Sequence, residues 1–335
     1  MKDNIIQVQL WNKDVGLLSW DDKQGCSVFQ FDKDFIQYGW NIAPLIAPLD
    51  SAYVQKSFPM SGNKEKLYGG LPEFIADSLP DYWGNIVFQK WMEANHLHPK
   101  SVNAVDRLSF IGKRAIGALE FQPAHIQEDA SINIELSSLY ELANRLFLDR
   151  QDVNIDMSNN LIMEDLYKVG TSAGGQRPKA IIGMDEDTGI IRSGQADLPP
   201  NFKHYILKFD TSKQNEQPCT KVEMAYYLMA KDAGINMMPS KLVEIEGRQN
   251  FLTQRFDRHN GKKIHTQTLA AMSSFADAYE DLFVVGRKLN LSADEQSQQY
   301  RRMVFNVIAE NVDDHTKNFS FIMLPNGEWH ISPAY

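Results

Sequence analysis

Short apolar runs alternate with polar turns near the N-terminus, and this pattern predicts a small antiparallel sheet over residues 5–31. The runs read IIQVQLW, VGLLSW and SVFQF, and turn residues such as Asp14, Gly16 and Asp21 separate them. The same kind of pattern predicts further strands, because side chains along a strand face opposite sides of a sheet in turn. These strands are expected over residues 115–121, 204–210, 241–247 and 251–258, with a hairpin over 319–331.

Elsewhere, apolar residues recur three and four positions apart, which predicts amphipathic helices between the strands. Val87 and Trp91 form one such pair and indicate a core helix that follows a Gly- and Pro-rich turn. Ser138 and Glu141 have the spacing of a capping box, in which two side chains satisfy free N–H groups at a helix start. Further helices are expected over residues 103–111, 136–150, 221–233 and 300–310.

Composition and charge narrow the class of protein. With 335 residues, 43% of them hydrophobic, the chain can bury the core of two domains or of one large two-lobed domain. The net charge of -9 argues against a surface that wraps nucleic acid, because phosphate binding needs clustered Lys and Arg. Cys26 and Cys219 are too few for a disulfide framework or a zinc site. The N-terminus has no apolar run long enough for a signal peptide or membrane span, so a cytoplasmic protein is predicted.

The first candidate for chemistry is the stretch 311–320, NVDDHTKNFS. Asp313 and Asn318 have the D-x-x-x-x-N spacing of a phosphotransferase catalytic loop. In such a loop the carboxylate accepts the proton of the attacking hydroxyl, and the amide oxygen holds a magnesium ion against the nucleotide phosphates. The spacing also occurs by chance. Its setting, between a predicted helix and a predicted hairpin, favours the catalytic interpretation.

Closely spaced glycines precede a predicted strand in the stretch 169–183, VGTSAGGQRPKAIIG. Glycines let backbone N–H groups approach and cradle phosphate oxygens, so a phosphate-binding loop is one interpretation. A flexible glycine turn in a hairpin is the other, because the stretch is not a Walker A sequence. The candidate residues are Gly170, Ser172, Gly174, Gly175, Arg177 and Lys179.

Lys208 lies inside an apolar predicted strand, HYILKFD, where a buried charge needs an anionic partner. Glu223, at the start of the next predicted helix, is the partner expected in a kinase-like lobe. The alternative is a lysine that reaches solvent and a glutamate on a wet helix face. In a kinase-like fold, the strands after this helix would lead to the hinge between the lobes, whose backbone contacts the adenine. The alternative is an ordinary strand end with a charged turn. Gln254, Arg255 and Phe256 are the hinge candidates.

Together these motifs resemble the HipA toxins, bacterial serine/threonine kinases of type II toxin–antitoxin modules. The matching pieces, in the family's order, are GLPEFIADSLPDYWGN, IGALEF, TSAGGQRPKA, HYILKFD, FLTQRFDR, DDHTKNFSF and ISPAY. The resemblance implies an α+β, protein-kinase-like two-lobed fold with an extra N-terminal β-rich subdomain. It also implies ATP and Mg2+ as cofactors and a HipB-like antitoxin that supplies the DNA-binding domain. The implied target class is an aminoacyl-tRNA synthetase, as glutamyl-tRNA synthetase is for the best-known member.

The resemblance also implies roles for single residues. Asp313 matches the catalytic aspartate, Asn318 matches a magnesium ligand, and His315 and Lys317 lie in the same matched loop. In the family, a serine at the start of the glycine-rich loop is autophosphorylated, which withdraws the loop and inactivates the kinase. Ser172 or Thr171 is the matching position. The candidate nucleotide-binding residues are Ser172, Gly174, Gly175, Lys179, Lys208, Gln254 and Phe256.

The expected domains are an N-terminal HipA-type subdomain over 1–125, a kinase-like N-lobe over 126–258 and the start of a C-lobe over 259–335. In the family, the run resembling ISPAY is followed at once by a magnesium-binding aspartate, and this sequence ends at Tyr335. We therefore expect either that the chain is truncated in its helical C-terminal part or that this part is a separate or lost segment. Loss of a main metal ligand predicts a poor kinase.

Three functions fit the sequence. The first is a kinase toxin that phosphorylates a translation factor or synthetase and slows growth. The second is a catalytically weak module that holds a HipB-like antitoxin on its operator, which suits the acidic net charge. The third is a small-molecule phosphotransferase, which the N-terminal motifs disfavour.

Overall fold

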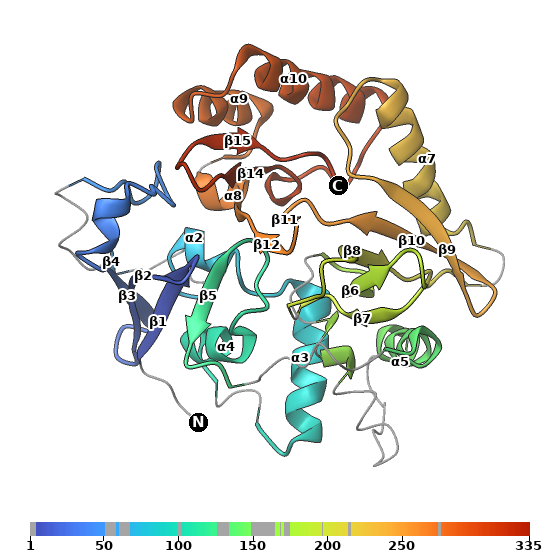
Figure 1. Ribbon diagram of the computed structural model, residues 1–335, viewed down its shortest axis with the longest axis horizontal. Helices are drawn as coiled ribbons and strands as arrows, with labels where there is room; N and C mark the ends of the chain where they lie inside the picture. The colour runs from blue at the N-terminus through green and yellow to red at the C-terminus, as the bar shows by residue number, and fades with distance from the viewer. Residues whose placement is uncertain are drawn as a thin grey trace.

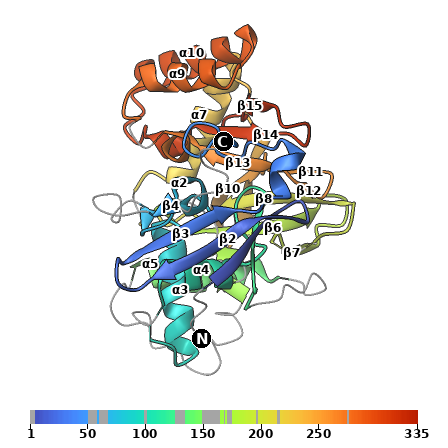
Figure 2. The same cartoon turned by 90° about the vertical axis from the view of Figure 1, so that its left-hand side faces the viewer.

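A computed structural model gives the fold as a mixed α/β arrangement with several separate sheets (Figure 1). It describes residues 5–50, 58–59, 68–98, 102–125, 134–148, 165–167, 169–170, 175–195, 197–213, 216–273 and 276–335. Figure 2 shows the first sheet crossing one face of the molecule, with helices α9 (Tyr279–Lys288) and α10 (Ala293–Ile308) at the far end.

The N-terminal sheet confirms the antiparallel strands predicted over residues 5–31. The prediction that Asp14 and Gly16 are turn residues is wrong, because both lie within the second strand and the first turn falls at residues 11–12. Its strand order is β4-β3-β2-β1-β5, and all its pairs are antiparallel. Gly16 is required where β2 crosses β3, because a Cβ there would lie 2.2 Å from the carbonyl oxygen of Gln30. The fifth strand begins at Leu119, later than the sequence predicted. The bounds are β1 Ile5–Leu10, β2 Lys13–Asp21, β3 Cys26–Phe31, β4 Phe58–Pro59 and β5 Leu119–Gln122.

A second five-stranded sheet, in the order β7-β6-β8-β10-β9, follows in the middle of the chain. Helix α7 (Cys219–Asp232) joins β8 to β9, and the two strands predicted around Gly247 are β9 and β10. The strand bounds are β6 Lys179–Asp185, β7 Ile191–Ser193, β8 Phe202–Lys208, β9 Ser240–Ile245 and β10 Arg248–Gln254.

The C-terminal part combines short strands with helices. Its three-stranded sheet has the order β13-β14-β15 and includes the predicted hairpin. The bounds are β11 Arg258–His259, β12 Lys262–Lys263, β13 His265–Thr268, α8 Leu269–Met272, η4 Thr316–Asn318, β14 Ser320–Met323 and β15 Trp329–Ile331. Earlier helices are η1 Phe35–Tyr38, α2 Glu73–Ala76, α3 Tyr82–Ala94, α4 Ala104–Ile111 and α5 Leu136–Leu148.

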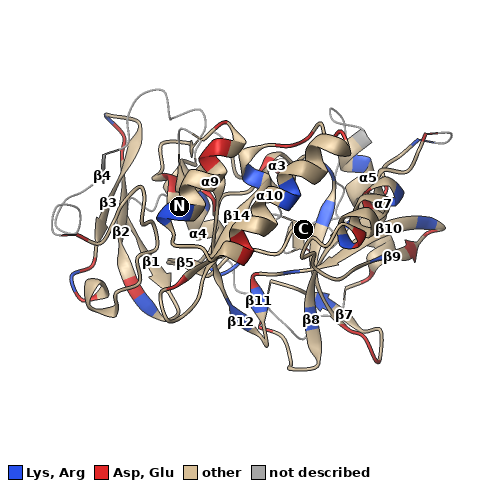
Figure 3. Cartoon of the chain, turned by 90° about the horizontal axis from the view of Figure 1, so that it is seen from above, with Lys and Arg blue, Asp and Glu red and all other residues tan. Residues whose placement is uncertain are grey.

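Helix starts show where sequence patterns misplace boundaries. Helix α10 begins at Ala293, earlier than the apolar periodicity predicted, because Ser292 and Glu295 form a capping box ahead of a polar first half. The capping box predicted from Ser138 is wrong, since α5 already begins at Leu136. The Ser138 hydroxyl instead donates to the Glu135 carboxylate at 2.8 Å. Helix α9 has acids in its first turn and bases in its last, which complements the helix dipole (Figure 3).

Two buried apolar clusters hold these elements together, and each joins distant parts of the chain. The first packs the N-terminal sheet, with Phe29 and Phe121, against C-terminal residues such as Leu282 and Phe321. The second packs Trp83 of α3, together with α5, against the middle sheet. Residues from either side of position 125 therefore share both cores.

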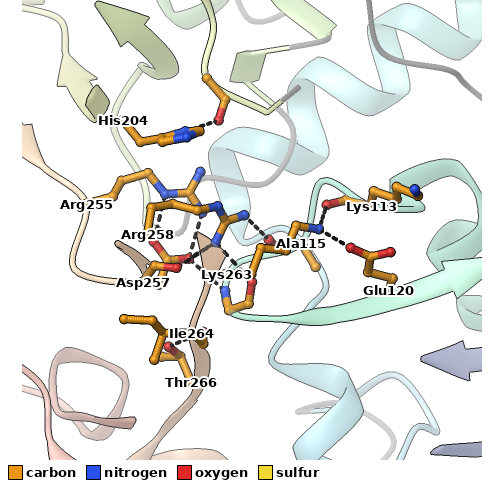
Figure 4. A network of polar contacts seen from close by, with 12 residues as sticks. Lys113, Ala115, Glu120, His204, Arg255, Asp257, Arg258, Lys263, Ile264 and Thr266 are labelled. Atoms are coloured by element: carbon orange, nitrogen blue, oxygen red, sulfur yellow. Dashed lines mark hydrogen bonds and ion pairs between the residues drawn. The ribbon is translucent and has the colours of Figure 1, made fainter. Parts of the chain in front are cut away.

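A buried ionic network also joins the N-terminal region to the segment after β10 (Figure 4). Asp257 accepts hydrogen bonds from Arg255 at 2.7 and 2.8 Å and from Arg258 at 2.8 Å. The Gly117 N–H donates to the same carboxylate at 2.8 Å. Nearby, Lys263 pairs with Glu120 at 2.7 Å. Burial would raise the pKa of Asp257, but the two guanidinium groups outweigh it and hold this pKa well below the ordinary value.

Within the described ranges, no helix is both long enough and apolar enough to cross a membrane. Neither Cys26 nor Cys219 forms a disulfide bond with another residue in the described part of the chain.

Acid should destabilise this fold through two buried histidines. Burial lowers the pKa of His265 to about 4, and burial with the charge of Arg255 does the same for His204. In the unfolded chain a histidine has a pKa near 6.5, so between pH 6.5 and 4 the two histidines bind protons in the unfolded chain but not in the folded one. Stability is therefore full above this window and is lost as pH falls through it.

Between pH 7.5 and pH 5, each histidine should lower the free energy of unfolding, measured in urea, by about 2 kcal/mol. His265→Gln should flatten the pH dependence, while the exposed His259→Gln should leave it unchanged. An equal pH dependence in wild type and His265→Gln would contradict the assignment to His265.

Candidate active site

The predicted catalytic loop lies between α10 and β14, and its end is fixed by the C-terminal sheet. The Leu269 N–H donates to the Phe319 carbonyl at 2.7 Å, which anchors the loop where β14 begins. Within the loop, the Asn318 side-chain nitrogen donates to the Asp313 carbonyl at 2.5 Å. His315 Nε2 lies 3.7 Å from Asp313 Oδ1, and the Asp313 side chain is 83% exposed. The Asn318 side chain is thus held against the Asp313 backbone, and both side chains are open to solvent.

The two adjacent aspartates of the loop have different surroundings. Asp314 accepts a short hydrogen bond from the Tyr279 hydroxyl, which also accepts one from Asn306 at 3.2 Å. This network ties the loop to α9 and α10. Asp313 points into solvent, so it is the aspartate that a ligand can reach.

The predicted contact between Lys208 and Glu223 is confirmed. Lys208 ends β8, Glu223 lies in the first turns of α7, and their side chains form a short ion pair. The lysine ammonium also lies 5.5 Å from the ring centroid of Phe251 on β10. The Lys208 side chain is 25% exposed, so the paired ammonium still reaches solvent.

A second lysine lies beside this pair. Lys179 is opposite Lys208 in the β6–β8 register and is 7% exposed. Burial and the nearby Lys208 lower the pKa of Lys179 to about 8, and the charges of Glu223, Asp81 and Asp313 act in the opposite direction. Gly175 has a φ of +92°, a backbone conformation that favours glycine, and a Cβ added there would lie 2.6 Å from the Lys179 ammonium. Ser172 and Gly174, with Thr171, lie outside the described residues.

Asp81, which the sequence analysis missed as a site residue, joins the glycine-rich stretch to the catalytic loop. Its carboxylate accepts the Gly175 N–H at 3.0 Å and pairs with the Lys317 ammonium at 2.5 Å. Asp81 belongs to the GLPEFIADSLPDYWGN motif. The signal that could have identified it is an acidic residue between Pro80 and the aromatic residues that begin the next helix. Periodicity alone gave no reason to place it near residue 317.

The hinge candidates meet the catalytic loop through Tyr335. The ring of Phe256 lies 4.9 Å from the ring of Tyr335, whose hydroxyl donates to the Lys317 carbonyl at 3.2 Å. Gln254 ends β10, and its backbone N–H donates to Pro239 at 3.0 Å. The Arg255 side chain is bound to Asp257 in the buried network, and its backbone N–H donates to the His204 carbonyl at 2.9 Å.

Two family models cover most of the chain. The HipA N-terminal domain matches residues 6–122, and the HipA-like C-terminal domain matches residues 171–335. The chain belongs to the HipA family. Of the pieces that carried the resemblance, the catalytic loop, the lysine strand and the C-terminal run all lie within the second match.

Known relatives agree with this assignment. A solved complex of HipA from Shewanella oneidensis MR-1 with HipB and operator DNA superposes on 98% of this chain and 75% of that chain. The TM-score is 0.66 at 18% sequence identity, so the likeness shows the fold, which is the kinase-like fold of HipA. A Haemophilus influenzae protein named "Putative kinase" is 26% identical over 187 residues. That match covers 50% of this chain and 52% of the relative, so the chain spans about half the length of this curated relative.

The side chains of this HipA-family site include the Asn318 amide and the ammonium groups of Lys179 and Lys208. Among the residues that the structure describes, no group of three or more His, Cys, Asp or Glu side chains is arranged to hold a metal ion. The Asn318 amide uses its nitrogen for the bond to Asp313, and its oxygen is a donor atom suited to Mg2+. Lys179 and Lys208 lie opposite each other on neighbouring strands, and positive charge of this kind is what a polyphosphate requires.

Proposed function

We propose that this chain is a serine/threonine protein kinase toxin that transfers the γ-phosphoryl group of ATP to a translation-related protein, such as an aminoacyl-tRNA synthetase. The observation that carries the proposal is the convergence of two lysines, the glycine-rich stretch and the catalytic loop. Asp81 contacts both Gly175 and Lys317, and Lys179 lies opposite Lys208 on the neighbouring strand. These groups come from segments far apart in the sequence.

Each residue has a role that its surroundings support. Lys208, oriented by Glu223, and Lys179 would bind phosphate oxygens, with the Gly175 backbone close by. Gln254 and Phe256 would border the adenine. Asp313 would accept the proton of the attacking hydroxyl, with His315 and Lys317 beside it, and Asn318 would hold Mg2+. ATP with Mg2+ supplies the transferable phosphoryl group and neutralises part of its charge.

The proposed architecture is two-lobed. The middle sheet with α7 corresponds to the N-lobe, and the three-stranded sheet with α8–α10 begins the C-lobe. The proposed boundaries are 1–125 for the N-terminal subdomain, 126–258 for the N-lobe and 259–335 for the C-lobe. Phe256 next to Tyr335 lies where these lobes would meet.

Regulation and partnership follow the family. Phosphorylation of Ser172, or of Thr171, would add negative charge to the glycine-rich loop and, as in the family, withdraw the loop from the site. A HipB-like antitoxin would neutralise the toxin and provide the contact with DNA. The solved HipA relative is a complex with HipB and operator DNA, which supports this partnership.

A second candidate function is a catalytically weak module that binds the antitoxin and strengthens repression. The observation in its favour is the outer face of α10, where Tyr300, Val307 and Ile308 are 58%, 67% and 77% exposed. Apolar patches of this kind mark interaction surfaces. Nucleotide binding in calorimetry without phosphate transfer to protein would favour this function over the kinase.

Replacing Lys208 by methionine tests the nucleotide site. Loss of a charge-assisted contact to phosphate should weaken Mg2+–ATP binding by about 10- to 100-fold in calorimetry. Lys203→Met is the matched control, because Lys203 lies on the same strand but pairs with Glu186 in solvent. Equal ATP affinity in wild type and Lys208→Met would refute the proposed role of Lys208.

A further inference from the structure

The Asp81 side chain is used in an unusual way for its position. Asp81 precedes α3 as the N-cap residue, where an aspartate ordinarily accepts an N–H from the first turn of its own helix. Here the side chain makes no capping hydrogen bond. Its oxygens accept from Gly175 at 3.0 Å and from Lys317 at 2.5 Å. Asp81 therefore does not stabilise the start of α3 as a cap, and its carboxylate instead contacts two segments that are distant in the sequence.

The neighbouring Trp83 makes this connection rigid. Trp83 is fully buried, and its backbone N–H donates to the Gly175 carbonyl at 3.2 Å. Its indole N–H donates to the Lys179 carbonyl at 2.9 Å. The segment 81–83 therefore holds the backbone of the glycine-rich stretch at both ends of residues 175–179.

A second acid anchors the same segment to the C-terminal part. Asp77 accepts the Thr268 N–H at 2.7 Å and the Thr268 hydroxyl at 2.9 Å. Burial raises the pKa of Asp77, while these hydrogen bonds and the charge of Lys317 lower it. Thr268 immediately precedes α8, whose first N–H holds the end of the catalytic loop at Phe319. Segment 77–83 thus touches both halves of the candidate site.

We infer that Asp81 is a positioning residue of the phosphate site: its carboxylate fixes the Lys317 ammonium and the Gly175 backbone relative to each other. This inference rests on the proposed kinase function and deepens it. It makes the N-terminal region part of the catalytic apparatus, because Asp81 lies within the HipA N-terminal domain match. Asp81 acts through its two partners, and the phosphate would contact them.

The expected kinetic signature follows from opposing effects of the Asp81 charge. Removing a carboxylate from the phosphate site leaves more positive charge, which favours bound ATP. Releasing Lys317 and Gly175 loses alignment, which matters most in the transition state. Asp81→Asn should therefore lower kcat about tenfold or more, while KM for ATP stays within about threefold of wild type or falls. A residue needed only for folding would instead reduce the melting temperature and the active fraction at unchanged kcat per folded molecule.

A double-mutant cycle identifies the partner. If Asp81 acts through Lys317, kcat of Asp81→Asn/Lys317→Met should lie within about twofold of the slower single variant. Effects that multiply would overturn the inference. Glu93→Gln is the control, since Glu93 lies on α3 and pairs within its own helix, with Lys90 at 2.9 Å. It should keep wild-type kcat and KM.

Hydrogen exchange tests the same link without any phosphate transfer. In the nucleotide-free protein, Asp81→Ala removes the acceptor of the Gly175 N–H, so exchange in a peptide covering 175–183 should accelerate about tenfold or more. Unchanged exchange would overturn the inference. If wild type transfers no phosphate to protein but Asp81→Ala exchanges faster, the kinase proposal fails and the structural link stands.

Discussion

Asp313→Ala is expected to abolish growth arrest when the chain is expressed and to lower phosphate transfer by about 10²- to 10⁴-fold. The reason is that Asp313 is the exposed carboxylate of the catalytic loop, 3.7 Å from His315, and is free to meet a hydroxyl. Its loss removes the proton acceptor, while the lysines that bind phosphate remain. Affinity for ATP in calorimetry should therefore change little.

The adjacent aspartate provides a matched control. Asp314→Asn keeps an acceptor for the Tyr279 hydroxyl, so it should retain phosphate transfer within a few-fold of wild type. Growth arrest by Asp313→Ala equal to that of wild type, at equal protein levels, would rule out the kinase mechanism. If Asp314→Asn lost activity and Asp313→Ala did not, the reactive carboxylate would be Asp314 and our assignment to Asp313 would be wrong.

The largest effect on stability is expected from Asp257→Ala, at about 3 to 5 kcal/mol of unfolding free energy. Asp257 lies between Arg255 and Arg258, and the three side chains are between 2% and 4% exposed. Without the carboxylate, two buried guanidinium groups lose their counter-ion and the Gly117 N–H loses its acceptor. Burial and Arg255 already lower the pKa of Arg258 to about 10, which shows how poorly this site tolerates unpaired positive charge.

Urea unfolding followed by circular dichroism measures this cost. Glu93→Ala removes an exposed ion pair and should change stability by less than about 1 kcal/mol. The stability loss in Asp257→Asn should lie between those of Asp257→Ala and Glu93→Ala, because the amide oxygen still accepts hydrogen bonds but carries no charge. A stability loss in Asp257→Ala no larger than that of Glu93→Ala would show that the network adds nothing to the fold.

Local patterns predicted most elements, and their failures have local causes. The strands of residues 5–31, the helix at 104–111 and the hairpin after the catalytic loop all follow from periodicity and turn residues. The start of α10 was missed because its first turns are polar and its capping box lies before the apolar stripe. Ser138 was mistaken for a cap because its spacing to Glu141 is also compatible with the interior of a helix.

The sequence by itself determined the chemistry-bearing motifs: the D-x-x-x-x-N loop, the strand lysine with its helix glutamate, and the glycine-rich stretch. These are short motifs whose meaning depends on residues a few positions apart. Only the tertiary structure decided that Asp81 binds Gly175 and Lys317, that Tyr335 joins the hinge candidates to the loop, and that both cores cross the middle of the chain. The physical reason is that hydrogen bonds and buried contacts between segments 18 to 236 residues apart leave no period in the sequence.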